Sequence, residues 1–187
     1  MSPQRQAKLV DFIAACDLGV VSYLSAEGTP QSAVVGIAVT PDLEIVFDTV
    51  ASSRKYSCLK GRAECSVVIW SGEVTLQFEG IAAETTDDCY KEAYFKKMPD
   101  GRDRLSWPGI TYFVVRPTWI RYSDYDARPP VIEEFSLKKG AGTSTSPIHK
   151  ENRAVIALPA RLTPPEWPAS SRPSHSSRPS YSKPETS

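Results

Sequence analysis

A short segment, residues 47–56, holds the side chains whose types and spacing most clearly suggest chemistry: Phe-Asp-Thr-Val-Ala-Ser-Ser-Arg-Lys-Tyr. The pattern predicts a strand followed by a helix, with Ser52 or Ser53 as the N-cap residue. Arg54 and Lys55 then lie in the first helical turn, where positive charge opposes the helix dipole. An anion at this end would explain them, because backbone N–H groups, hydroxyls, a guanidinium and an ammonium together suit a phosphate. The alternative is a solvated surface pair that binds nothing.

Histidine usage excludes several catalytic classes from most of the chain. The two histidines, His149 and His175, both lie near the C-terminus. Residues 1–137 therefore cannot build a Ser-His-Asp or Cys-His site or an ordinary histidine-containing metal site, and no metal site is predicted. The four cysteines form no C-x-x-C pair. Chemistry in this part must come from carboxylates, Lys, Arg, Tyr or a bound cofactor, and the sequence assigns no catalytic residue.

The elements that would position these residues are mostly strands in hairpin order. Apolar periodicity and turn signals predict six or seven strands interrupted by short helices. This arrangement is typical of a mainly β fold, a small antiparallel barrel or sandwich, and the connections are too short for a doubly wound parallel sheet. The expected helices are 4–16, 53–60 and one from Thr86 or Asp87 to Met98; the expected strands are 18–24, 31–39, 43–48, 64–70, 73–83 and two pieces within 110–122.

Composition divides the chain after Leu137. Residues 138–187 contain eight of the 16 prolines and ten serines, and carry 8 Lys and Arg against 3 Asp and Glu, a net charge of +5. We expect a folded domain over 1–137 and a disordered Pro/Ser-rich tail over 138–187. The whole chain has a net charge of zero and no apolar stretch long enough to span a bilayer. The sequence thus predicts a cytoplasmic protein that binds neither nucleic acid nor membranes.

Residues 18–125 resemble the FMN-binding split barrel of the pyridoxamine 5′-phosphate oxidase family. The motifs that carry the resemblance are Thr49 with Ser53-Arg54-Lys55, the strand that ends in Phe78-Glu79-Gly80, and Arg-Pro-Thr-Trp-Ile-Arg-Tyr at 116–122. The resemblance implies a split β-barrel of six to seven strands and an FMN-dependent oxidoreductase with a small-molecule substrate. It also implies a homodimer with its flavin sites at the interface.

The resemblance further implies where FMN would be bound. The phosphate would lie at the start of the predicted helix, the ribityl chain at the end of the preceding strand, and the isoalloxazine ring along the backbone of an earlier strand. Two more positions correspond to a glutamine and a tryptophan near the flavin of the oxidase. In this order the residues are Ser53, Arg54 and Lys55; Asp48 and Thr49; Ala33, Val34, Val35 and Gly36; and Thr75 and Trp119.

Two other functions stay open on the same fold. The domain could bind a flavin without turnover, as a non-catalytic binding or sensing module, or it could be a deazaflavin-dependent reductase. The oxidase has an arginine and a lysine on the strand equivalent to Ala33–Gly36, and an Arg/His/Asp-rich segment after the position of Trp119, and this chain has neither. The resemblance therefore extends to the cofactor more than to the vitamin substrate.

Overall fold

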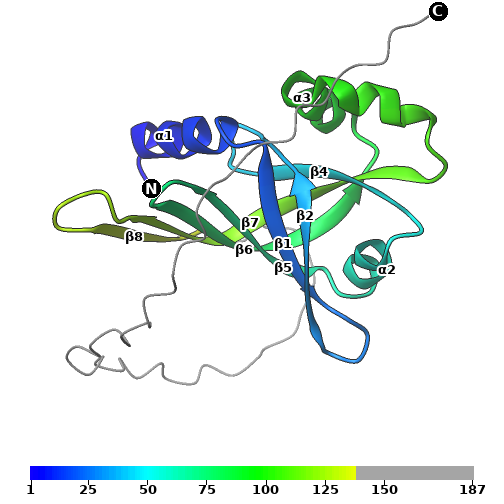
Figure 1. Cartoon of the computed structure of the whole chain (residues 1–187), viewed down its shortest axis with the longest axis horizontal. Coiled ribbons are helices and arrows are strands. Elements are labelled where there is room, and N and C mark those ends of the chain that lie inside the picture. Colours follow the sequence, from blue (N-terminus) through cyan, green and yellow to red (C-terminus); the bar gives the residue numbers. More distant parts are fainter. Residues whose placement is uncertain (138–187) are drawn as a thin grey trace, which may run out of the picture. The chain divides into compact units, whose positions relative to one another are not determined.

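Antiparallel strands form one curled sheet in the computed structural model, which describes residues 1–137 (Figure 1). Seven strands follow one another in the spatial order β2-β1-β5-β6-β7-β4-β3, and β8 pairs with β7 outside this path. The predicted mainly β, antiparallel split-barrel fold is confirmed. The strands are β1 (Leu18–Leu24), β2 (Pro30–Gly36), β3 (Ala38–Val39), β4 (Ile45–Val50), β5 (Glu64–Ser71), β6 (Val74–Thr85), β7 (Ile110–Asp124) and β8 (Val131–Ser136).

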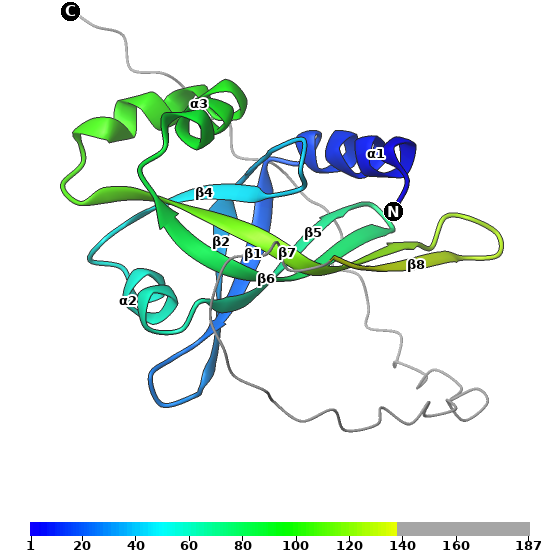
Figure 2. The same cartoon turned by 180° about the vertical axis from the view of Figure 1, so that it is seen from behind.

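Helices lie around this sheet (Figures 1 and 2). They are α1 (Pro3–Ala14), α2 (Arg54–Gly61), α3 (Asp88–Lys97) and the 3₁₀-helix η1 (Pro99–Ser106). The amphipathic pattern of α1 buries Leu9 and Ile13 in the core, as the apolar spacing predicts. None of the helices in residues 1–137 combines the length and the hydropathy that crossing a bilayer requires.

Strand alternation sends side chains to two separate apolar clusters. Phe47 of β4 and Phe113 of β7 point into the main core and stack at a centroid distance of 5.6 Å. Their neighbours Val46 and Tyr112 point to the opposite face, where they pack under α3. The second cluster holds α3 beside β4, directly next to the segment with the candidate phosphate site.

Strand β7 is continuous, whereas the sequence predicts two pieces separated at Pro117. Residues 110–115 pair with β4, and residues 119–124 pair with β8. Pro117 falls between the two partners, where β7 needs no N–H donor on that side. On its other side it lies opposite Gly80, where the ladder to β6 shifts its register. Proline therefore does not interrupt β7, because the ladder to β6 has a bulge there and the partner on the other side changes from β4 to β8.

Two elements had no clear sequence signal. Helix η1 follows Pro99, which was expected only to end the preceding helix. Strand β8 lies just before the predicted domain boundary. Leu137 continues its pairing by donating its backbone N–H to the carbonyl of Thr118 at 2.9 Å. The predicted Pro/Ser-rich tail, residues 138–187, lies outside the described residues, so its disorder and the boundary at Leu137 stay predictions.

Candidate functional site

The strand-to-helix junction between β4 and α2 forms a polar cradle, which we define as Thr49, Ser53, Arg54 and Lys55. Ser53 is the N-cap of α2, as predicted, and its Oγ accepts the backbone N–H of Tyr56 at 3.3 Å. The same oxygen lies 2.8 Å from Oγ1 of Thr49, which is buried at the end of β4. One hydroxyl therefore joins the strand end to the helix start, and the first N–H groups of the helix have no intrahelical acceptor.

The cradle carries two positive charges. Lys55 is half-buried and Arg54 is exposed. Within residues 1–137, no carboxylate lies within 4.0 Å of either cationic group. Burial lowers the pKa of the Lys55 ammonium, and the charge of Asp48 acts in the opposite direction. A partly desolvated ammonium beside a helix N-terminus favours an anionic ligand, because an anion would compensate both the charge and the dipole.

Glu84 of β6 fixes the orientation of α2. Its Oε1 accepts the hydroxyl of Thr111 at 2.6 Å, and its Oε2 accepts the ammonium of Lys60 at 2.9 Å. The hydroxyl of Tyr56 reaches the same Oε2 at 3.4 Å. These hydrogen bonds lower the pKa of the Glu84 carboxyl, with Thr111 the largest cause. The helix that carries the cradle is therefore tied to two strands of the barrel.

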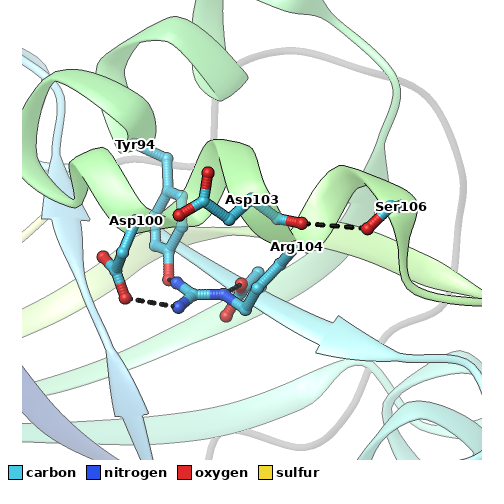
Figure 3. A network of polar contacts seen from close by, with 6 residues as sticks. Tyr94, Asp100, Asp103, Arg104 and Ser106 are labelled. Carbon is cyan, nitrogen blue, oxygen red and sulfur yellow. Dashed lines mark hydrogen bonds and ion pairs between the residues drawn. The ribbon is translucent and has the colours of Figure 1, made fainter. Parts of the chain in front are cut away.

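Asp48 is held by an arginine that the sequence pattern does not reveal. Nε of Arg104, on η1, donates to Oδ2 of Asp48 at 2.7 Å, and NH1 of the same guanidinium donates to Oδ2 of Asp100 at 2.7 Å. Its NH2 donates to the Tyr94 hydroxyl at 3.1 Å. Figure 3 shows the guanidinium of Arg104 between Asp100 and Tyr94. Burial, followed by the charge of Asp48, raises the pKa of Tyr94.

The predicted ring-lining strand reaches this network at one end. A Cβ added to Gly36 would lie 3.2 Å from the Tyr94 hydroxyl and 2.9 Å from the Met98 side chain, so glycine leaves room for both. Ala33 and Val35 face the core, whereas Val34 is 62% exposed on the other face. In the part of the chain that the structure describes, β2 pairs only with β1. The backbone on its other edge is therefore available to a ligand.

The remaining two predicted residues lie far from the cradle. Thr75 is near the β5–β6 turn and pairs with Trp70 and Ser123, while Trp119 pairs with Glu79 and Ser136. The cradle is near the opposite end of the same ladder, where Thr85 pairs with Tyr112. At about 3.3 Å per residue, about 33 Å of strand separates Thr75 from Thr85, and about 20 Å separates Glu79, the partner of Trp119, from Thr85. One chain thus brings together Gly36, Asp48, Thr49, Ser53, Arg54 and Lys55, but neither Thr75 nor Trp119 joins them.

Solved structures with the same fold come from several bacteria. General stress protein 26 from Bacillus anthracis str. Sterne gives a TM-score of 0.59 at 20% identity, over 72% of this chain and 99% of that chain. A Clostridium acetobutylicum protein related to general stress protein 26, of the pyridoxinephosphate oxidase family, gives 0.57 at 14%, over 73% and 97%. A heme-binding protein from Mycobacterium smegmatis gives 0.60 at 16%, over 73% and 58%. At these identities the likeness shows the fold alone.

Sequence comparison with protein families gives a broader match. A search of curated proteins found no similar sequence. A family model described as pyridoxamine 5′-phosphate oxidase, however, matches residues 6–124, which include every strand from β1 to β7 and the whole cradle. With this match and the split-barrel architecture, the chain belongs to the pyridoxamine 5′-phosphate oxidase family.

Proposed function

We propose that the protein is an FMN-dependent oxidoreductase whose cradle binds the phosphate of the cofactor. The observation that carries the proposal is the pair of cations, Arg54 and Lys55, at the capped start of α2 without a carboxylate partner in residues 1–137. Members of this family typically bind flavin. A flavin phosphate carries nearly two negative charges, which match the two cations and the helix N-terminus.

The chain's own residues would bind and orient the cofactor. Lys55 and Arg54 would neutralise the phosphate. One of the Thr49 and Ser53 hydroxyls donates to the other, and the second would donate its proton to a phosphate oxygen. The free edge of β2 would offer backbone groups to the ring system. When bound, FMN supplies the electron-accepting chemistry that no side chain in this region has. The cradle thus fits the FMN phosphate, and the edge of β2 fits the ring system. The substrate would be a small molecule of unassigned class.

The proposal includes a homodimer with flavin sites at its interface. Thr75 and Trp119 lie too far from the cradle to touch the same flavin within one chain, so a second copy would have to supply them. The outer face of the sheet offers a surface for that copy. Leu18, Val34 and Trp70 are 51%, 62% and 48% exposed on neighbouring strands. Large apolar side chains gathered on one sheet face are typical of a protein interface.

A titration of apoprotein with FMN and with riboflavin tests the phosphate role. The Arg54→Ala change removes charge-assisted hydrogen bonds worth about 1.5–3 kcal/mol each, so FMN should bind about ten to a hundred times more weakly. Riboflavin lacks the phosphate and should bind equally to both proteins. Arg62→Ala, an exposed arginine at the C-cap of the same helix, is the matched control and should change neither affinity. Equal losses for both ligands, or no loss for FMN, would contradict the proposal.

Further measurements separate this function from the other two. The absorption spectrum and mass of the small molecule that copurifies distinguish FMN from a deazaflavin. Reduction of the bound flavin by NAD(P)H or an amine supports an oxidoreductase, and tight binding without turnover supports a binding module. Light scattering of the flavin-loaded protein tests the dimer, and a monomer mass would contradict the shared site.

A further inference from the structure

Asp48 puts a negative charge next to a site that is proposed to bind an anion. It directly precedes Thr49 of the cradle at the end of β4. Burial lowers the pKa of the Lys55 ammonium, and the negative charge of Asp48 partly opposes this effect. An unpaired carboxylate here would repel a phosphate and would compete with it for Lys55. The charge of Asp48 must therefore be compensated for the cradle to favour anions.

Arg104 provides this compensation from a distant part of the chain. Among the described residues, its guanidinium is the one cationic group within 4.0 Å of Asp48. The two side chains keep only 15% (Asp48) and 19% (Arg104) of their surface exposed, so water screens their attraction less than it would on an open surface. The second carboxylate on Arg104, Asp100, is 65% exposed and lies four residues earlier in the same 3₁₀-helix, η1 (Figure 3). Asp48 is thus the partner that depends on Arg104.

We propose that Arg104 is a positioning residue for phosphate recognition: it pairs with Asp48 and compensates its charge, so that the Lys55 ammonium stays available to the phosphate of the cofactor. This inference rests on the proposed function and assigns a role to a residue outside the cradle. The Tyr94 hydroxyl accepts a hydrogen bond from NH2 of Arg104 and lies beside Gly36. The hydrogen-bond network of Arg104 therefore reaches the end of β2. Without Arg104, the Asp48 carboxylate would be left without an ion-pair partner, and its negative charge would act on Lys55 and on the phosphate uncompensated.

The first experiment measures the ratio of FMN affinity to riboflavin affinity. Arg104→Met keeps most of the side-chain volume and removes the charge. We expect the ratio to fall about tenfold, because only FMN has the phosphate that Lys55 would bind. A merely structural role of Arg104 in η1 would weaken both ligands equally and leave the ratio unchanged, and this result would overturn the proposal. A thermal denaturation curve of each variant shows whether the fold is retained.

A pair of double variants separates the local effect from net charge. Asp48→Asn combined with Arg104→Met should restore the wild-type ratio, because the competing carboxylate is gone. Asp100→Asn combined with Arg104→Met has the same net charge and removes the other carboxylate of Arg104. It should keep the tenfold loss. Equal recovery in both double variants would show that only total charge matters, and would overturn the role of Asp48.

A measurement without ligand keeps this inference distinct from the proposed function. The pKa of Lys55 can be followed by NMR in apoprotein whose lysines carry ¹³C-methyl groups, with the Lys55→Arg variant identifying the signal. Arg104→Met should raise this pKa, and the added Asp48→Asn change should reverse the rise. An unchanged pKa would overturn the inference. If wild-type protein binds FMN and riboflavin equally, the phosphate site fails, while the NMR result still decides whether Arg104 controls Lys55.

Discussion

The hydroxyl of Thr111 donates to Oε1 of Glu84 at 2.6 Å, across the ladder that joins β6 to β7. The other oxygen of this carboxylate binds Lys60 and Tyr56 of α2. A single carboxylate thus connects two barrel strands with the helix that carries the cradle. Neutralising it should loosen the cradle without touching any residue proposed to bind phosphate.

Glu84→Gln should lower the free energy of unfolding by about 1 kcal/mol at pH 7, the difference between hydrogen bonds to a charged and to a neutral acceptor. The folded-state pKa of Glu84 is lowered, so its contribution is present above the unfolded pKa and is lost as the pH falls through the folded pKa, below about 4.5. Urea denaturation at pH 7 and pH 3.5 should therefore show a smaller difference between wild type and variant at the lower pH. Glu134→Gln, in the more exposed pair with Arg121, is the control and should cost less.

Ser52 and Ser53 are adjacent, but only Ser53 caps α2, so the two serines allow a matched comparison of stability and FMN affinity. Ser53→Ala removes the N-cap of α2 and should cost about 1 kcal/mol in unfolding free energy. It also leaves the buried hydroxyl of Thr49 without its partner, so FMN should bind several times more weakly. Ser52 is exposed and does not cap the helix, so Ser52→Ala should change neither quantity. Equal effects of the two changes, by denaturation and by flavin titration, would show that the cap does not organise the cradle.

Gly80 lies at the register shift between β6 and β7. A Cβ at this position would lie 2.6 Å from the carbonyl oxygen of Arg116 and 2.8 Å from Cγ1 of Val115. Gly80→Ala forces the bulge to shift and should cost about 1–3 kcal/mol, measured by urea denaturation. Gly61, at the end of α2, has open space around it, so Gly61→Ala should be neutral or slightly stabilising. A Gly80→Ala variant as stable as wild type would show that the bulge yields freely.

Two shortened chains test where the folded unit ends. A chain of residues 1–137 should keep its melting temperature and its FMN affinity, because β8 and Leu137 remain in place. A chain of residues 1–130 loses β8, the core contact of Phe135 and the ion pair between Glu133 and Arg5. It should be less stable by about 2 kcal/mol or more. If the longer piece is insoluble or fails to bind FMN, residues beyond Leu137 contribute to the fold.

The cradle was predictable because its signals are local. The hydroxyl residues before α2, the cations in its first turn and the preceding alternating strand all lie within residues 47–56. The ion pair between Asp48 and Arg104 joins positions 56 residues apart, and no local spacing rule predicts such a contact. Only folding of the sheet brings Arg104 of η1 into contact with Asp48 near the end of β4.

The strand errors have a similar cause. Pro117 ends a strand by any local rule, and its tolerance depends on which neighbours β7 has on each side. Strand β8 follows Pro129 and Pro130 and has two adjacent glutamates, so its pattern did not indicate a strand. It forms because residues 119–124 present a free edge that it can pair with.

Because β7 continues past Pro117, the β6–β7 ladder spans the sheet without a break. One end of this ladder supports the cradle through Thr111, Ser123 lies near the other end, and Trp119 lies between them. In a symmetric pair of chains, the length of the ladder would set how far apart the two ligand sites lie and which ligand length fits between cradle and partner. Adding two residues to each of the two strands would lengthen the span by about 7 Å and keep every side chain on its original face. In such a pair, strand length would set the size of the ligand, separately from the residues that touch it.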